Sequence, residues 1–167
     1  MKKLMLTITF MFAAIMMASA EITDAQIQES KDRVEKIREI KSNLENASTG
    51  NATVDGFKDK AVETCEEVIQ SGEKMAELYE AMNSGKNVLN EVMALSTQLI
   101  EEGKKAAEMG KMAEPAAKAI KEIKNPKALI SAKKIITGAT DASTQTIKEI
   151  AFQVQLVKEM VDVLKSR

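Results

Sequence analysis

Apolar side chains recur every three or four residues along most of this 167-residue chain, and this spacing decides its fold. An α-helix brings such residues onto one face, whereas a strand needs apolar residues at every second position. The clearest run comprises Ala61, Cys65, Val68, Gly72, Met75, Tyr79 and Met82. A seam with this seven-residue repeat is typical of helices that pack nearly parallel or antiparallel, at about 20°. The pattern predicts an all-α protein, an antiparallel bundle of about four long helices with coiled-coil-like packing.

The first helix is expected to begin at Thr23 or Asp24, because either side chain can accept a hydrogen bond from the free amides of a first turn. Apolar residues recur on one face of this segment: Ile27, Val34, Ile37, Ile40 and Leu44. Residues 46–54 are small and polar, so they predict a loop, and Asp55 is expected to cap the second helix.

Residues 83–85 have two interpretations. A turn at Gly85 would end the second helix and make a hairpin, whereas a glycine inside one long helix would cost only about 1 kcal/mol. Three poor helix formers stand together here, which favours the turn. The seven-residue phase also continues past this point, and it predicts that a further set of residues lies in the same seam: Leu89, Ser96, Gly103, Gly110 and Ala117.

The next helix is expected at residues 86–124 and changes character at Gly103. From there its packing face is small, which predicts close packing against a neighbouring helix: Gly103, Ala106, Ala107, Gly110, Ala113, Ala116 and Ala117. Pro115 is expected to kink this helix or to open a new segment, and Pro126 marks a firmer boundary.

The last helix is predicted at residues 127–165, with a bend at Thr137 and Gly138. Four residues widen its apolar face beyond one stripe, which predicts that it is the most buried helix: Phe152, Leu156, Met160 and Val163. Residues 150–156 also alternate as a strand would. The helical spacing continues past both ends of this segment and favours the helix.

Residues 1–20 have the pattern of a cleavable export signal. Lys2 and Lys3 precede an apolar run at residues 4–17, which is shorter than the roughly 20 residues that a membrane-crossing helix needs. Ala18, Ser19 and Ala20 have the small side chains of a cleavage site. We therefore expect cleavage after Ala20 and a single helical-bundle domain at residues 21–167. The short basic start favours a bacterial source and a location in the periplasm or the medium.

The charges are unevenly spread. Residues 21–102 contain 18 acidic and 9 basic residues, residues 103–134 contain 3 acidic and 9 basic, and the remainder is balanced. Four lysines of the basic stretch, at spacings of seven and three, form a candidate interaction face for an anionic partner or an acidic membrane surface: Lys104, Lys111, Lys118 and Lys121. Two alternatives are that the stretch folds against the acidic first half, or that it is solvated surface without a partner. Nucleic acid is not expected as a partner, because residues 21–167 have 22 basic and 25 acidic residues.

The chain contains no histidine, which removes the usual general base near neutral pH and the commonest transition-metal ligand. Glu66-Glu67 and Glu101-Glu102 are adjacent carboxylates, but neighbours in a helix point about 100° apart and do not converge on one substrate. We interpret both pairs as solvated surface and expect no catalysis, no cofactor and no bound metal. The single cysteine, Cys65, lies in an apolar seam, which predicts a buried thiol; a disulfide between two copies is the alternative.

These observations favour an exported, non-enzymatic helical bundle that acts by protein–protein interaction or self-association. The alternative is a membrane-active or lipid-binding bundle, of the pore-forming or lipid-carrier type, with an anionic membrane surface as its partner. The basic, alanine-rich stretch and the adaptable methionines motivate this alternative, whereas the scarcity of aromatic residues argues against it.

Overall fold

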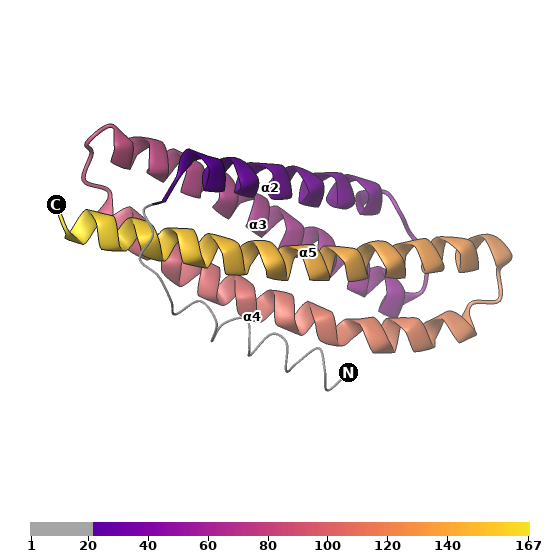
Figure 1. Cartoon of the computed structure of the whole chain (residues 1–167). Helices are drawn as coiled ribbons and strands as arrows, with labels where there is room; N and C mark the ends of the chain where they lie inside the picture. Colours follow the sequence, from indigo (N-terminus) through magenta and orange to yellow (C-terminus); the bar gives the residue numbers. More distant parts are fainter. Residues whose placement is uncertain (1–21) are drawn as a thin grey trace.

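The computed structural model describes residues 22–167 and arranges them as four α-helices, in which consecutive helices run antiparallel and α3 and α5 run parallel to each other (Figure 1). The helices are α2 (Asp24–Glu45), α3 (Ala52–Asn83), α4 (Leu89–Ala119) and α5 (Pro126–Lys165), and a short 3-10 turn, η1 (Ile120–Glu122), follows α4. The predicted all-α bundle is confirmed, and residues 150–156 are helical. Residues 1–20, for which the sequence predicts an export signal, lie outside the described part of the chain.

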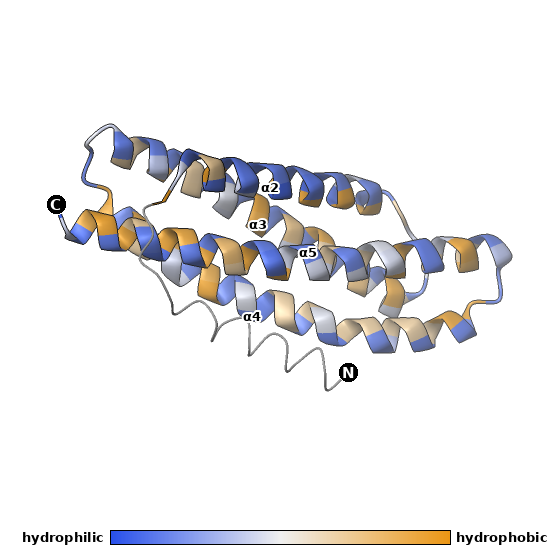
Figure 2. Ribbon diagram, viewed as in Figure 1, coloured by the Kyte–Doolittle hydropathy of each residue, from blue (hydrophilic) through white to orange (hydrophobic). Residues whose placement is uncertain are grey.

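The helices α3 and α5 form the centre of the bundle. They pack against each other and against both outer helices, α2 and α4. Figure 2 shows the outer surface of α2 as mostly hydrophilic, as its peripheral position requires. The last helix is not the most buried one, because α3 buries 14 of its 32 residues and α5 buries 13 of its 40. The central position of α3 and α5 explains why each buries a larger share of its residues than α2 or α4.

The helix starts are fixed by side-chain caps. Thr23 caps α2 as predicted, in a capping box in which the Gln26 side chain accepts a hydrogen bond from the Thr23 amide at 2.8 Å. Asn51, and not Asp55, caps α3, so this prediction is wrong. The Asp55 carboxylate instead accepts hydrogen bonds from the amides of Thr49 and Gly50, each at 2.9 Å, and ties the connecting loop to the first turn of α3.

The turn at Gly85 is confirmed. Gly85 has a φ of +80°, a left-handed conformation that glycine adopts without steric cost. The Lys86 amide donates to the carbonyl of Ala81 at 3.1 Å, and the Gly85 amide donates to the carbonyl of Met82 at 3.1 Å. These two hydrogen bonds make a Schellman motif, which ends a helix by satisfying its last carbonyls.

The turn also resets the phase of the next helix. The seam predicted through Leu89, Gly103 and Ala117 is wrong: Leu89 and Gly103 are half-buried, and Ala117 is exposed. The inward face of α4 is instead made by Val92, Leu95, Leu99, Glu102, Ala106, Met109, Ala116 and Ala119. The phase of one helix cannot be carried through a turn, because the link rotates the helix that follows.

Pro115 lies inside α4, and the helix continues through it to Ala119, so the proline does not open a new segment. The 3-10 turn η1 then ends the helical run. Asn125 caps α5, and its side-chain oxygen accepts hydrogen bonds from the amides of Lys127 and Ala128 at 2.9 and 3.3 Å. Pro126 occupies the first turn of α5, where the missing amide hydrogen costs nothing.

Three apolar clusters fill the interior. The cluster nearest the α3–α4 connection includes Met75, Met82, Val92, Leu99, Leu156 and Met160. A second cluster, towards the other end, includes Ile37, Phe57, Val68, Met109 and Ile150. A small third cluster, under the α4–α5 connection, comprises Val54, Ala119, Ala132 and Ile135.

The predicted close packing of small α4 residues is confirmed at Ala106, Gly110 and Ala116, which pack near α5, but not at Ala117, which is exposed. Ala106 and Ala116 are fully buried, and a methyl group added at Gly110 would lie 3.4 Å from the Ser143 hydroxyl. A similar approach occurs at Gly138 of α5, where an added methyl group would lie 3.0 Å from a methyl of Leu44. α5 runs without interruption through Gly138.

Replacing Gly85 by alanine is expected to lower the free energy of unfolding by about 1 kcal/mol, because an L-residue is strained at positive φ. Gly56 provides the matched control, since it lies inside α3 with open space around it, and Gly56→Ala is expected to raise the free energy of unfolding by up to about 1 kcal/mol. Urea denaturation measures both. A Gly85→Ala protein as stable as wild type would contradict the turn.

Candidate functional site

The four lysines predicted as an interaction face are all exposed, but they lie on two elements. Lys104, Lys111 and Lys118 occupy α4, one heptad apart, and Lys121 lies in η1. Two of them pair within their own helix, Lys104 with Glu101 at 2.6 Å and Lys118 with Glu114 at 2.8 Å. For Lys111 and Lys121 no ion pair is found with any residue in 22–167.

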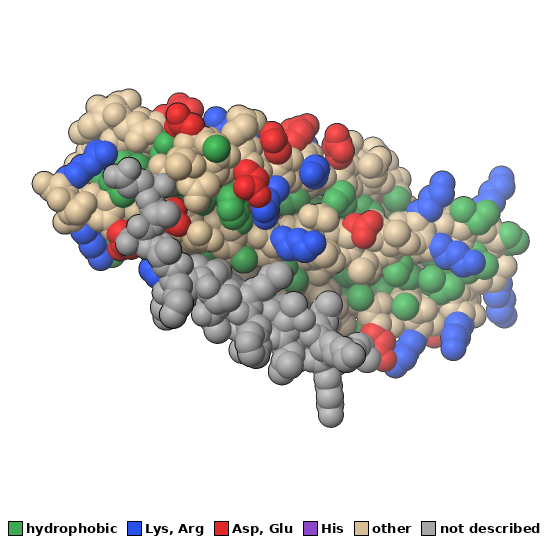
Figure 3. All heavy atoms as spheres, viewed as in Figure 1, with side chains coloured by type: hydrophobic (Ala, Val, Ile, Leu, Met, Phe, Trp, Pro, Cys, Tyr) green, Lys and Arg blue, Asp and Glu red, His purple; other side chains and the backbone are tan. Residues whose placement is uncertain are grey.

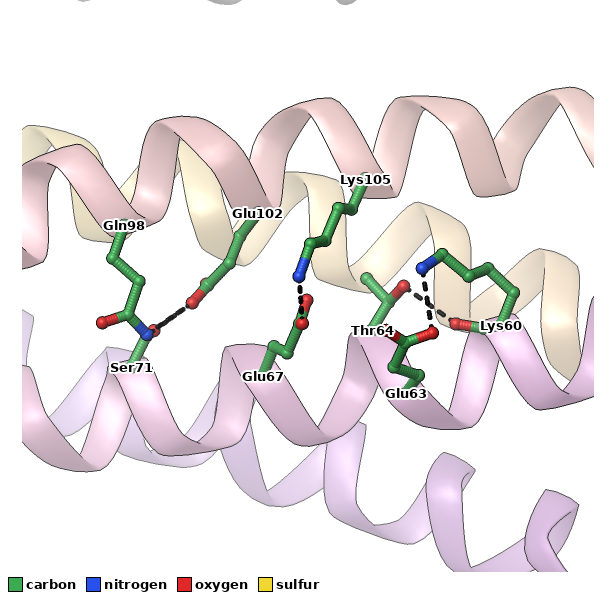
Figure 4. A network of polar contacts seen from close by, with 8 residues as sticks. All are labelled: Lys60, Glu63, Thr64, Glu67, Ser71, Gln98, Glu102 and Lys105. Carbon is green, nitrogen blue, oxygen red and sulfur yellow. Dashed lines mark hydrogen bonds and ion pairs between the residues drawn. The ribbon is translucent and has the colours of Figure 1, made fainter.

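One lysine of the basic stretch reaches the acidic half of the protein. Lys105 of α4 forms an ion pair with Glu67 of α3, which Figure 4 shows bridging the two helices. The alternative in which the basic stretch folds against the acidic half requires ion pairs between α4 and another helix. Among the ion pairs between described residues, Lys105 makes the one such pair from this stretch. Apart from Lys104 and Lys118, which pair within α4, the other lysines of the stretch leave their charge on the surface.

The outer side of α4 also carries two exposed large apolar residues, Met93 and Ile100. Each is 49% exposed, and they lie one heptad apart. Their stripe continues towards the lysines in steps of four and three, and we call it the α4 outer face: Met93, Thr97, Ile100, Lys104, Ala107 and Lys111. Five of these six residues are exposed, and Ala107 is half-buried.

A second basic surface lies at the end of the bundle where α4 and α5 are connected. We call it the basic tip, and it contains six exposed lysines and one acidic residue, Glu122, between residues 118 and 134: Lys118, Lys121, Lys124, Lys127, Lys133 and Lys134. Figure 3 shows lysine and arginine side chains projecting around this end, at the right of the view, with apolar side chains between them. The most exposed large apolar residue of the described chain, Ile130 at 59%, lies in this segment.

The middle of the bundle contains a buried polar layer that joins all four helices. On one side, the Ser30 hydroxyl of α2 donates to the Glu149 carboxylate of α5, and the Gln153 amide donates to the same carboxylate at 3.0 Å and to the Val68 carbonyl at 3.4 Å. On the other side, Ser71 and Gln98 donate to the Glu102 carboxylate of α4 at 2.5 and 2.8 Å. Figure 4 shows this second group.

The interpretation of Glu102 as solvated surface is therefore wrong, because only 3% of it is exposed. Glu149 and Gln153 were missed as interior residues, and both are fully buried. Their spacing in the sequence does indicate an interior position, because the polar residues are in phase with the apolar ones. The inward face of α5 steps by three and four through Ala142, Thr146, Glu149, Gln153, Leu156 and Met160.

Burial raises the pKa of Glu149 to about 7, while the hydrogen bonds from Ser30 and Gln153 and the nearby Arg33 act to lower it. Burial also raises the pKa of Glu102, against the hydrogen bonds from Ser71 and Gln98. One oxygen of each carboxylate has no partner, so ionisation leaves part of each charge unsatisfied. Neither group is open to a substrate, because both are enclosed by the helices.

A shallow groove of about 430 Å³ crosses the surface between α2 and α3. Val34, Gly72 and Ala76 line it, and an ion pair between Arg38 and Glu73 at 2.7 Å joins the two helices beside it. Gly72 separates this groove from Gln153 of the buried polar layer, since a methyl group at Gly72 would lie 2.9 Å from the Gln153 amide nitrogen.

Cys65 is fully buried in the seam of α3, and burial raises the pKa of its thiol to about 12. Such a thiol is protonated and inaccessible at neutral pH. Residues 22–167 contain no group of three cysteine or acidic side chains placed to hold a metal ion. Within the same residues, no helix combines the length and the apolar character that crossing a membrane requires.

Comparison with known protein families, with curated proteins and with solved structures finds no match. The two surfaces and the buried polar layer are therefore interpreted from their own chemistry.

The buried carboxylate predicts a specific pH dependence. The folded protein holds the Glu149 proton up to about pH 7, whereas an ordinary glutamate loses it near pH 4.5, so the contribution of Glu149 to the free energy of unfolding falls between these values. The free energy of unfolding of Glu149→Gln, relative to that of wild type, should therefore rise by up to about 3 kcal/mol from about pH 4 to about pH 8. Urea denaturation at both pH values measures the gain. Glu91→Gln, an exposed position on α4, is the control for removal of one charge; an equal gain in both variants would exclude Glu149 as the cause.

Gly72 is required by the close approach of three helices. An added methyl group would lie 2.6 Å from a methyl of Val34 as well as 2.9 Å from Gln153, so Gly72→Ala should lower the free energy of unfolding by about 1–3 kcal/mol. Val34→Ala removes the nearer contact, and the double variant should lose about 1 kcal/mol less than the sum of the two single losses. Additive losses in denaturant titrations would show that the two sites do not touch.

Proposed function

We propose that this protein is an exported, non-enzymatic helical bundle that acts by binding another protein or a second copy of itself. The observation that carries the proposal is the α4 outer face, where Met93 and Ile100 lie exposed one heptad apart on a helix whose opposite side is buried. A stripe with this repeat fits the apolar seam of another helix.

The charges beside the stripe support a choice of partner. Lys104 and Lys111 follow Ile100 on the same side of α4. A partner helix that covers Met93 and Ile100 would therefore meet lysines at one end, which favours a helix with acidic residues there. Such flanking charges set the direction in which the partner binds.

The interior of the bundle supports binding rather than catalysis. The carboxylates with raised pKa values, Glu102 and Glu149, are enclosed and hold the helices together through their hydrogen bonds. The thiol of Cys65 is enclosed as well. The groups left on the α4 outer face are aliphatic side chains, lysines and a threonine, which suit recognition.

Export remains part of the proposal, and it is based on the signal pattern at residues 1–20. In the periplasm or the medium, the burial of Cys65 would protect its thiol from oxidation and from pairing with another copy. N-terminal sequencing of the protein recovered outside the cytoplasm tests cleavage after Ala20.

A second candidate function is binding to an anionic membrane surface. The basic tip favours it, because six exposed lysines surround an exposed isoleucine at one end of the bundle. The first function uses the side of α4 and the second uses the end of the bundle, so both can operate in one molecule.

Site-specific crosslinking tests the binding function. Thr97→Cys places a thiol between Met93 and Ile100, and Cys65 does not react because it is buried. Thr144→Cys is the matched control, since both threonines are exposed helix residues that donate to the carbonyl four residues earlier. A thiol-reactive crosslinker applied to cells should give one defined adduct from Thr97→Cys, and adding Met93→Ser and Ile100→Ser should abolish it.

The mass of the adduct separates a second copy from another protein. Equal labelling patterns from Thr97→Cys and Thr144→Cys, together with a strict monomer in light scattering, would count against the α4 outer face as a binding site.

A further inference from the structure

We propose that the basic tip binds the anionic headgroups of a lipid bilayer, with Ile130 entering the interface and the bundle standing away from the surface. This inference deepens the second candidate function and does not depend on the first. It rests on the charge, the exposed apolar centre and the residue types of the tip.

Most of the charge of the tip is not neutralised by its surroundings. Among its six lysines, Lys118 pairs with Glu114 at 2.8 Å, and the segment itself contains one acidic residue, Glu122. The helix ends beside the neighbouring α2–α3 connection supply three acidic residues. Glu45 pairs with Lys41 at 2.9 Å and Asp59 pairs with Lys58 at 2.9 Å, whereas Asp55 keeps its negative charge because its hydrogen-bond donors are neutral. A positive field therefore extends from this end of the bundle.

The apolar centre is supported from beneath. Ile130 projects at 59% exposure, and Ile123 and Leu129 nearby are half-buried. Ile123 packs against the small core cluster under the α4–α5 connection, which holds the tip in shape. Figure 1 places this connection at the opposite end of the bundle from the α3–α4 turn, beside the α2–α3 connection.

The residue types favour lipid over an acidic protein or a nucleic acid. Every basic residue between positions 118 and 134 is a lysine, a flexible point charge that suits a fluid surface of headgroups, whereas specific recognition of carboxylates or phosphates favours the planar fork of arginine. The segment has no aromatic residue on which a base could stack. At an anionic membrane surface Ile130 would add buried apolar area to the electrostatic attraction of the lysines, the two terms on which interfacial binding depends.

Co-sedimentation with vesicles tests the proposal. With vesicles of equal parts phosphatidylglycerol and phosphatidylcholine at low salt, replacing Lys121, Lys124 and Lys127 by glutamine should lower the partition coefficient about a hundredfold, since each lysine near an anionic surface contributes about fivefold. The matched control replaces Lys36, Lys86 and Lys148, which are exposed and for which no ion pair with a described residue is found, and it should change binding by less than about threefold.

The apolar part is tested separately. Ile130→Ser should weaken vesicle binding several-fold, whereas Ile100→Ser on the side of α4 should leave it unchanged. All variants carry the same N-terminus, so differences among them report on the tip. Circular dichroism checks that each variant stays helical, as expected for exposed positions.

Three results would overturn the proposal: equal losses in the two lysine triples, undiminished binding after replacement of Lys121, Lys124 and Lys127, or binding to pure phosphatidylcholine as strong as to the anionic vesicles. Tighter binding to a polyglutamate peptide than to vesicles would assign the tip to an acidic protein instead. None of these results affects the crosslinking test at Thr97, so the lipid-binding proposal and the protein-binding proposal can be rejected independently of each other.

Discussion

Hydrogen bonds to the buried Glu149 and Glu102 carboxylates hold the four helices in one register. A buried carboxyl group without partners costs several times more than an aliphatic side chain in the same place. Ser30, Gln153 and Ser71 supply those partners from three different helices. Sliding any helix by one heptad would set a carboxyl group against aliphatic side chains, and this penalty selects the observed alignment.

The surfaces follow from this alignment. Since α3 and α5 pack against each other at the centre, α4 is left with one buried side and one free side, and the free side carries Met93 and Ile100. The connection between α4 and α5 closes the end of the bundle and gathers lysines that lie up to sixteen residues apart in the sequence, from Lys118 to Lys134. The interior is occupied by packing and by enclosed polar groups, so the proposed functions belong to the outside.

The sequence predicted the parts of the fold that depend on local patterns. The seam of α3, the Thr23 cap and the turn at Gly85 each follow from a few neighbouring residues, and all three are confirmed. The inward face of α4 could not be predicted from the phase of α3, because the rotation introduced by the Gly85 turn depends on its three-dimensional path. Asn51 and Asp55 are both good capping residues, and the closure of the preceding loop decides between them.

The candidate site was predicted in part. The spacing of Lys104, Lys111 and Lys118 on α4 correctly indicated exposed positions, whereas the basic tip needs the fold, since it combines the end of α4, η1 and the start of α5. The buried polar layer could not be predicted, because a glutamate in phase with apolar residues favours the surface unless it has hydrogen-bond partners. Its hydrogen-bond partners come from other helices, and only the assembled bundle brings them together.

Native-state hydrogen exchange tests most directly whether the polar layer locks the centre of the bundle. Amides beside the layer, at residues 68–75 of α3 and 149–156 of α5, should exchange only through global unfolding, and amides of the outer helix α2 should exchange faster. Exchange beside the layer at rates typical of helix ends would show that the helices separate there while the rest stays folded, and would contradict a register held by Glu149 and Glu102.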